Sequence, residues 1–314
     1  MERYLVTGGA GFIGSHIAGE LVRRGEEVRV IDNFLTGKRE NLTPFLDRIE
    51  FIEGDIRDIK TCQKVTDGVD FVLHQAALPS VPRSIEDPLL ASDINIRGTL
   101  NLLCAARDEG VKTFVFASSS SVYGDDPRLP KTEEMTPAPL SPYAVTKSVG
   151  EMYCQVFSQI YGLPTVCLRY FNVFGPRQDP FSQYAAVIPN FIEKMLRGEQ
   201  PIIYGDGEQS RDFSYVSNVV EANLIAAKKA GVSPAVFNIA CGERTSVNTL
   251  VNKLNEILGT GIVPIHDEPR PGDVKHSLAD ITKSRKLLEY APAVSFTQGL
   301  EKAVRWFQER RKDG

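Results

Sequence analysis

A run of glycines between a short apolar segment and a helix-like segment constrains the fold of this chain more than any other feature. Residues 7–14 read Thr-Gly-Gly-Ala-Gly-Phe-Ile-Gly, which fits both G-x-G-x-x-G and G-x-x-G-x-x-G. Residues 3–7 have the composition of a buried strand, and residues 12–24 are predicted to form a helix. Glycines in such a turn let the backbone approach a pyrophosphate, and the helix N-terminus supplies N–H donors. The pattern predicts a dinucleotide site that includes Gly8, Gly11, Phe12, Ile13 and Gly14.

Strand-like and helix-like segments alternate from the first residue, as in βαβ proteins. We predict strands over residues 3–7, 27–31, 49–53, 71–74, 113–117 and 164–169, and helices over 12–24, 87–109 and 143–160. Right-handed crossovers would build a doubly wound parallel α/β sheet of the Rossmann type, covered on both faces. Beyond about residue 172, prolines and glycines interrupt shorter elements. We therefore expect a cofactor-binding domain over residues 1–175, which carries the catalytic residues, and a smaller, interleaved α/β region over 176–314 that binds substrate.

Composition narrows the classes of protein and of partner. The net charge of −4 gives no basic footprint for nucleic acid, and no run of eighteen apolar residues could span a membrane. The N-terminal residues lead directly into a strand without a secretory signal, so we expect a cytoplasmic protein. Five scattered cysteines without a CxxC pair indicate buried thiols, and neither they nor the four histidines predict a metal site.

Further polar residues follow the predicted strands where a nucleotide would bind. Asp32 ends the second strand, at the distance from the glycines where a carboxylate can bind the adenosine ribose. Its charge would repel a 2′-phosphate, which favours NAD over NADP, although Lys38 in the following loop could weaken that preference. Asp55 either bonds the adenine amino group or caps the next helix. The other expected cofactor contacts from these segments are Asn33, Thr36, Gly37, Ile56, Gln75, Ala76 and Ala77.

Tyr143 and Lys147 are candidates for a proton-transfer pair. Residues four apart share a helix face, and Ser141-Pro142 is a plausible start for the helix that carries them. A nearby ammonium favours the phenolate form of tyrosine, and so would a positively charged nicotinamide. The alternative is that Tyr-x-x-x-Lys is an ordinary helix surface.

The serine run at residues 118–121 follows the fifth predicted strand, at the edge where α/β sheets bind ligands. With the glycine loop, Asp32, Tyr143 and Lys147, it makes the chain resemble the extended short-chain dehydrogenase/reductases. Within that superfamily the chain is most similar to the nucleotide-sugar 4-epimerases, above all those acting on UDP-N-acetylglucosamine and UDP-N-acetylgalactosamine. The segments that support this are residues 76–84, 168–175, 178–180 and 184–189.

The resemblance implies a reversible oxidation at C4 of the sugar with tightly bound NAD. Tyr143 would remove the proton of the 4-hydroxyl, and the 4-ketose would turn and take hydride back on its other face. Lys147 would bind the nicotinamide ribose and lower the pKa of Tyr143, while Ser119 or Ser120 would bond the reacting oxygen. Related dehydratases and decarboxylases usually carry an acid where this chain has Ser120-Ser121. The alternatives are a UDP-glucuronate epimerase or decarboxylase, or a catalytically silent dinucleotide-binding sensor.

The resemblance also implies a substrate site. Asn172, Arg211 and Arg270 match positions that bind the diphosphate, unless the arginines pair with acids such as Asp212 or Asp273. Epimerases confined to non-acetylated sugars hold a tyrosine at the position of Ser277, so the small residue here leaves space for an N-acetyl group without excluding UDP-glucose. Other contacts expected are Val173 with the cofactor, and Ser80, Val187, Tyr204 and Asp273 with the substrate. The helices over 87–109 and 143–160 resemble a pair that forms a four-helix dimer interface, so a homodimer is expected.

Overall fold

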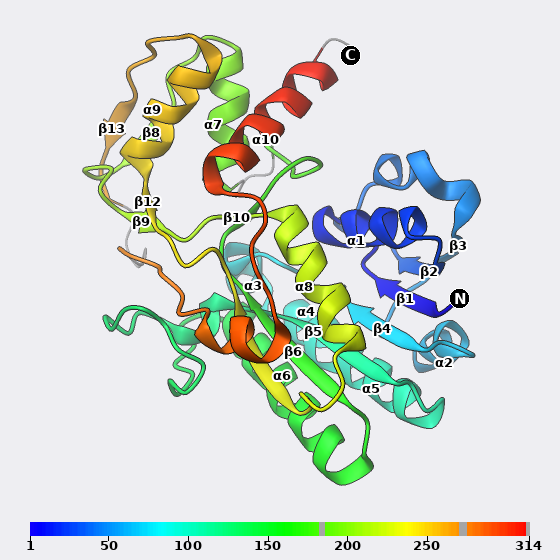
Figure 1. Ribbon diagram of the computed structural model, residues 1–314. Helices are drawn as coiled ribbons and strands as arrows, with labels where there is room; N and C mark the ends of the chain where they lie inside the picture. Colours follow the sequence, from blue (N-terminus) through cyan, green and yellow to red (C-terminus); the bar gives the residue numbers. More distant parts are fainter. Residues whose placement is uncertain (182–185, 270–274, 312–314) are drawn as a thin grey trace.

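A seven-stranded parallel sheet forms the centre of the computed structural model, which describes residues 1–181, 186–269 and 275–311 (Figure 1). The strand order is β11-β6-β5-β4-β1-β2-β3. The strands are β1 (Arg3–Thr7), β2 (Glu27–Asp32), β3 (Glu50–Glu53), β4 (Phe71–His74), β5 (Thr113–Ser119), β6 (Thr165–Tyr170) and β11 (Ala235–Ile239). From β1 the order runs through β2 to β3 at one edge, and through β4, β5 and β6 to β11 at the other. The predicted doubly wound Rossmann sheet is confirmed.

Helices cover both faces of the sheet because successive strand residues point to opposite sides. Tyr4 and Val6 belong to one buried cluster, together with side chains of α1 (Phe12–Arg23) and α8 (Val216–Lys228). Leu5, between them, belongs to a second cluster with α2 (Ile59–Thr66), α5 (Gly98–Asp108) and α6 (Pro142–Tyr161). The near-continuous apolar runs of the strands are thus explained by burial on both sides.

The helix predicted over residues 87–109 is interrupted. It comprises α4 (Pro88–Ser92), a π-helical segment (Asp93–Arg97) and α5, and α3 (Val81–Glu86) precedes it. Within the π-helical segment the Asn95 side chain accepts a hydrogen bond from the Leu78 amide (2.7 Å) and donates to Thr146 Oγ1 of α6 (3.0 Å). The interruption therefore coincides with buried hydrogen bonds that link three segments. Hydrophobic periodicity does not reveal such bonds.

The chain beyond residue 175 contributes to the sheet and also builds a separate layer. α7 (Val187–Leu196), α9 (Val247–Leu258) and α10 (Phe296–Arg310) pack on one another (Figure 1). Three strand pairs accompany them: β7 (Val173–Phe174) with β10 (Ser214–Tyr215), β9 (Ser210–Arg211) with β12 (Thr245–Ser246), and β8 (Ile202–Tyr204) with β13 (Ile265–Asp267). The shorter helical turns are 3-10 helices at Arg39–Asn41, Thr43–Arg48 and Ser120–Tyr123 and a π-helix at Ser284–Leu288. Among the described residues, no helix has both the length and the apolar character needed to cross a membrane.

Candidate active site

The glycine turn joins β1 to α1 as the sequence predicts. Gly8 has a φ of +65°, and its carbonyl accepts a hydrogen bond from the Gly11 amide (3.0 Å). A Cβ on Gly14 would lie 2.2 Å from that same carbonyl oxygen, so only glycine fits there. Gly11 is the N-cap of α1 and provides no side-chain cap. The first-turn N–H groups of α1 therefore lack a side-chain acceptor, which suits a phosphate.

Asp32 ends β2 beside this turn. Its Oδ2 accepts from the Ala10 amide (2.9 Å) and its Oδ1 from the Phe34 amide (2.8 Å). Burial raises the pKa of the Asp32 carboxyl, and the backbone hydrogen bonds oppose that rise. Each carboxylate oxygen has a second lone pair, so acceptor capacity is left for a ribose hydroxyl. These residues fit the adenosine and pyrophosphate of NAD.

A cavity of about 280 Å³ runs along the carboxyl ends of the strands and gathers most of the predicted cofactor contacts. Its lining includes Gly8, Gly11, Phe12, Ile13, Gly14, Asp32, Asn33, Thr36, Asp55, Ile56, Gln75, Ala76, Ala77, Tyr143 and Lys147. Gly37 instead packs on Asp32, where an added Cβ would lie 2.9 Å from the carboxylate oxygens. Val173 lies in the β7–β10 pair. One cavity thus connects the glycine turn with the Tyr143–Lys147 pair.

Sequence reasoning did not assign other residues that line this cavity. Ser118, the second-last residue of β5, belongs to the serine run that was expected at this edge but was given no role, and Tyr170 ends β6, so the rule that ligands bind at the carboxyl ends of strands could have found it. Arg177 and Asp179 also line the cavity, and Asp179 forms an ion pair with Lys38 (3.3 Å). The Lys38 side chain is partly exposed as well as paired. Nothing in the local sequence signals this contact.

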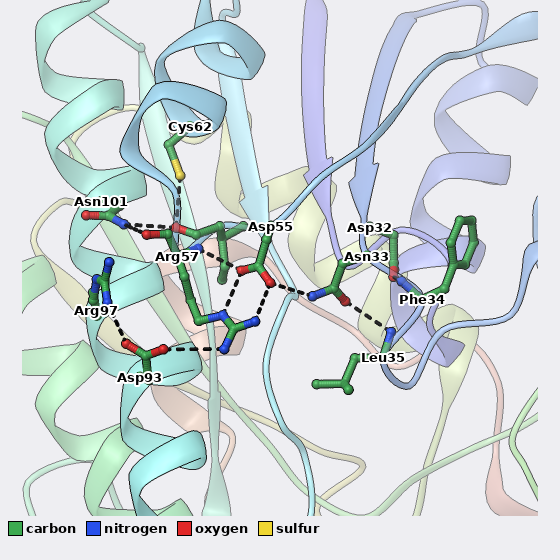
Figure 2. Close-up of polar contacts among 11 residues, drawn as sticks. Asp32, Asn33, Phe34, Leu35, Asp55, Arg57, Cys62, Asp93, Arg97 and Asn101 are labelled. Carbon is green, nitrogen blue, oxygen red and sulfur yellow. Dashed lines mark hydrogen bonds and ion pairs between the residues drawn. The ribbon is translucent and has the colours of Figure 1, made fainter.

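Figure 2 shows Asp55 within a polar cluster at one end of the cavity. Arg57 Nη2 donates to Asp55 Oδ2 (2.7 Å), and Asn33 Nδ2 donates to the same oxygen (2.9 Å). The hydrogen bond from Arg57 lowers the pKa of Asp55 to about 2. Arg57 Nη1 also reaches Asp93 Oδ2 (3.4 Å). Asp55 is therefore a fixed carboxylate at the cavity edge.

The alternative prediction that Asp55 caps the following helix is wrong. Asp58, which directly precedes α2, is the N-cap, and its carboxylate accepts from the amides of Lys60 and Thr61 (both 3.2 Å). The reason is that an N-cap side chain reaches the amides two and three residues later, a geometry available to Asp58 at this helix start.

Tyr143 and Lys147 lie in the first turns of α6. The Ser141 hydroxyl caps this helix by accepting from the Ala144 amide (3.2 Å), with Pro142 as its first residue. The cap and helix start predicted from the sequence are confirmed. Lys147 Nζ lies 5.8 Å from the centroid of the Tyr143 ring and donates to the Ala117 carbonyl at 2.8 Å. The helix thus brings the two groups to one end of the cavity.

Burial dominates the electrostatics of this pair. It raises the pKa of the Tyr143 phenol, while a hydrogen bond with Ser119 opposes the rise. It also lowers the pKa of Lys147 to about 8, although the negative charge of Glu151 acts in the other direction. The direction for Tyr143 differs from the depression expected from Lys147, because loss of hydration penalises the phenolate of this buried group.

The structure distinguishes the two candidate serines. Ser119 ends β5, its side chain opposes the rise in the Tyr143 pKa, and its Oγ accepts from the Ser121 amide (3.2 Å). Ser120 starts the 3-10 helix that follows. The geometry therefore brings Ser119 to the phenol.

Several predicted substrate residues are linked through the segment around Ser210. Arg211 Nη1 donates to the carbonyls of Ser210 and Lys275 (both 3.1 Å), and the Ser277 amide donates to the Ser210 carbonyl (2.9 Å). Asn172, with φ +34°, donates to the carbonyl of Asp212 (3.2 Å). These bonds bring Asn172, Arg211 and Ser277 into one connected region.

Asp212 is not the acid that pairs with a substrate-site arginine. Its side chain is fully buried and accepts from the amides of Cys241, Gly242 and Ala279 (3.0–3.2 Å). Burial raises the pKa of Asp212 to about 6. This carboxyl therefore holds backbone segments together.

The other predicted substrate residues occupy separate positions. Ser80 caps α3 by accepting from the Arg83 amide (3.3 Å). Val187 is the first residue of α7, and Tyr204 ends β8, with its carbonyl accepting from Gln209 Nε2 (2.9 Å). Arg270 and Asp273 lie outside the described residues.

Known proteins share this sequence and architecture. Residues 4–240 match the family described as the NAD dependent epimerase/dehydratase family. A putative UDP-glucose 4-epimerase of Methanocaldococcus jannaschii is 41% identical over 98% of this chain and 99% of its own length. The structure of the UDP-N-acetylglucosamine 4-epimerase of Methanobrevibacter ruminantium, solved with UDP-N-acetylmuramic acid, matches with a TM-score of 0.94 and 43% sequence identity. The structure of the UDP-glucose 4-epimerase of Thermotoga maritima, solved with UDP-glucose, matches with a TM-score of 0.94 and 42% sequence identity. Each match covers 98% of this chain and 99% of the other chain. The chain belongs to the NAD dependent epimerase/dehydratase family.

Proposed function

We propose that this chain interconverts UDP-N-acetylglucosamine and UDP-N-acetylgalactosamine by inverting C4 of the sugar, with NAD as its bound cofactor. The broader assignment, an NAD-dependent UDP-sugar 4-epimerase, is supported by the family and by relatives that match nearly the whole chain. The observation that carries the chemistry is that Tyr143 and Lys147 lie together on α6 and line the same cavity as the glycine turn, while Ser119 at the end of β5 opposes the rise in the Tyr143 pKa.

Tyr143, Ser119 and Lys147 have distinct roles in the proposed reaction. NAD, which the residues of the glycine turn and Asp32 would hold, would supply a reversible hydride acceptor for C4 of the sugar. Tyr143 takes the proton of the 4-hydroxyl, Ser119 holds the reacting oxygen, and Lys147 binds the nicotinamide ribose. Burial raises the pKa of Tyr143, so positive charge from Lys147 and from the oxidised nicotinamide has to stabilise its phenolate.

The residues around the serine turn favour epimerisation over elimination or decarboxylation. Ser120 and Ser121 occupy the place where related dehydratases and decarboxylases usually have an acid, and the Ser121 hydroxyl oxygen is buried. An epimerase needs no separate acid there, because hydride and proton return to the same carbon and oxygen.

The preference for an N-acetylated sugar rests on Ser277. Its side chain is small and its amide is bonded to the Ser210 carbonyl, which also accepts from Arg211. In the proposal Arg211 and Asn172 bind the diphosphate, and Ser277 leaves space for the acetyl group. Residues 176–314 supply most of this substrate site, while residues 1–175 hold the cofactor and the catalytic group.

We include a homodimer in the proposal. Val145, Met152, Val156 and Ile160 are 40–69% exposed and lie on one side of α6, while Leu89 of α4 is 81% exposed. α4 packs against α6, so these side chains form one apolar surface. A second copy is its proposed occupant, because two such helix pairs would bury the surface symmetrically.

The test starts from purified protein without added NAD. We expect denaturation to release NAD, and the native protein to convert UDP-N-acetylglucosamine into UDP-N-acetylgalactosamine, as followed by product chromatography. Tyr143→Phe should reduce turnover about 10²–10⁴-fold and still retain NAD. Tyr161→Phe, on the same helix but half exposed, is the matched control.

Parallel assays with UDP-glucose and UDP-glucuronate separate the alternatives. Turnover of UDP-glucose alone would reject the N-acetyl assignment, and release of CO₂ from UDP-glucuronate would indicate a decarboxylase. Near-normal activity of Tyr143→Phe would reject Tyr143 as the base.

A further inference from the structure

Glu151 is a buried carboxylate directly behind the proposed catalytic group. It follows Lys147 by one helical turn on α6, and its side chain is 8% exposed. Arg169 of β6 binds it in a bidentate manner, with Nε to Oε1 at 2.8 Å and Nη2 to Oε2 at 2.7 Å. Arg169 is itself buried and lies over the Tyr123 ring, 4.7 Å from its centroid. The carboxylate is therefore held in a rigid setting.

Glu151 also reaches the residues that line the cofactor cavity. Its Oε1 accepts a hydrogen bond from Ser118 Oγ, and Ser118 lines the cavity next to Ser119. The preceding residue, Ala117, accepts the hydrogen bond from Lys147 Nζ (2.8 Å). Two residues one turn apart on α6 thus bind two consecutive residues at the end of β5.

We propose that Glu151 is a positioning residue for the epimerisation, holding the Lys147 ammonium and the end of β5 in the arrangement that the reaction uses. This inference rests on the proposed function. Stability alone explains the pair poorly, since well-packed apolar side chains often replace a buried ion pair without loss of stability. A carboxylate at this place does something that apolar side chains cannot: it supplies negative charge beside a buried lysine.

The charged and titratable groups around Lys147 support this role. Burial lowers its pKa to about 8, and the charge of Glu151, followed by Cys154 of the same helix, opposes that shift. His74 of β4 lies within the field of Lys147, and burial lowers the His74 pKa to about 3, so it is neutral near pH 7. The Tyr143 ring lies near the ammonium, with its centroid 5.8 Å from Lys147 Nζ. Within the described residues, Glu151 is the carboxylate that acts on Lys147.

The groups that face Glu151 keep its charge in place. Arg169 is its counter-ion, and Ser118 donates to it. Cys167 of β6 lies within its field, and its own pKa is raised well above the usual value by a hydrogen bond with Cys154 and by burial, so the thiol is neutral near pH 7. The negative charge therefore remains available to Lys147.

The experiment replaces the charge while keeping a hydrogen-bond acceptor for Ser118. Glu151→Gln should shift the alkaline limb of the kcat/KM pH profile for UDP-N-acetylglucosamine to lower pH by about one pH unit or more, because the protonated Lys147 loses the negative charge that stabilises it. Glu151→Asp keeps the charge and should restore the limb toward the wild-type position. NAD retained after gel filtration at pH 9 should fall in the Gln variant for the same reason, which gives a readout independent of turnover.

Glu193→Gln is the matched control. Glu193 is equally buried on a helix, α7, and binds an arginine, Arg197, at 3.0 Å. Its replacement should leave the alkaline limb and the retained NAD unchanged. A shift of similar size in this control would mean that loss of a buried carboxylate elsewhere in the fold produces the effect, and it would overturn the inference.

A second variant covers the case in which Glu151→Gln fails to fold because Arg169 loses its counter-ion. The double variant Glu151→Gln, Arg169→Leu removes both charges, and we expect its alkaline limb to shift to lower pH as in the single variant. A folded variant with the wild-type limb would overturn the role of Glu151 while leaving the proposed function intact. A wild-type protein without epimerase activity would instead overturn the proposed function.

Discussion

At the scale of single residues, the structure indicates which of Ser119 and Ser120 accompanies the Tyr143–Lys147 pair, a choice that the sequence left open. Helical spacing predicts that the two side chains share a face, and they do. The spacing says nothing about hydration, and burial raises the pKa of Tyr143. The same surroundings favour Ser119 over Ser120, because the final residue of β5 is the one that acts on the pKa of the phenol.

Ser119→Ala should therefore reduce kcat about 10²–10³-fold, since it removes a donor aimed at the reacting oxygen. Ser120→Ala is the matched control, with the same change one residue along the chain, and it should retain most of the activity. The measurement is epimerisation of UDP-N-acetylglucosamine at saturating substrate. If the Ser120 variant lost more activity than the Ser119 variant, the assignment would be reversed.

Ser277→Tyr tests the substrate preference at one side chain. The bulkier ring should block the space proposed for the N-acetyl group, so turnover of UDP-N-acetylglucosamine should fall at least about 100-fold while UDP-glucose is retained. Both substrates are assayed with the same preparation, so each is the control for the other. Equal loss of both activities would remove Ser277 as a determinant of specificity.

At the scale of elements, the β1–α1 turn shows why its glycines are needed. A Cβ on Gly14 would lie 2.2 Å from the Gly8 carbonyl oxygen, so Gly14→Ala has to displace backbone. We expect this change to lower the free energy of unfolding by about 1–3 kcal/mol and to cause loss of bound NAD. Gly261→Ala is the control, because an added Cβ there meets no atom within 4 Å. Chemical denaturation and the NAD content of the purified variants measure both effects.

The exposed side of α6 leads to a prediction about assembly. Ile160 is 69% exposed on this helix, and Ile160→Arg would place a charge in the proposed interface. Sedimentation should show a dimer dissociation constant at least about tenfold higher than that of the wild type. Val263, 68% exposed, lies outside α4 and α6, so Val263→Arg should leave the dimer unchanged. A wild-type protein that sediments as a monomer would remove the dimer from the proposal.

At the scale of the whole molecule, local patterns predicted the sheet and the glycine turn but did not predict which distant segments meet. Six of the strands and their parallel orientation follow from apolar runs separated by helices. β11 was not predicted, because its place beside β6 depends on the path of the chain after residue 175. Asp179 reaches Lys38 across more than a hundred residues, for the same reason. Spacing along a helix is visible in the sequence, whereas contacts between lobes depend on packing.

Two buried histidines, His16 and His74, make the stability of the folded chain depend on pH. His16 donates to the Pro176 carbonyl (2.9 Å), which ties α1 to the later part of the chain, and burial lowers its pKa to about 4. His74 is fully buried between hydroxyls of Thr7 and Thr99, and its pKa falls to about 3. Between pH 6.5 and these values the unfolded chain takes up protons that the folded chain refuses, so folding stability falls as the pH is lowered.

Asp212 acts in the opposite direction, as do Asp32 and Glu133, whose pKa burial also raises. The pKa of Asp212 is raised to about 6, so its folded form binds a proton before its unfolded form does, and acidification from pH 6 toward 3.8 relieves a buried charge. A comparison of variants isolates the histidine contribution. We expect the free energy of unfolding in urea to fall between pH 7 and pH 5, and His16→Gln, whose amide can still donate to Pro176, to reduce that fall by on the order of 1–2 kcal/mol. An equal pH dependence in the wild type and the variant would show that His16 takes up its proton over the same pH range in the folded and the unfolded chain, and that burial at the junction of α1 with residue 176 does not exclude its proton.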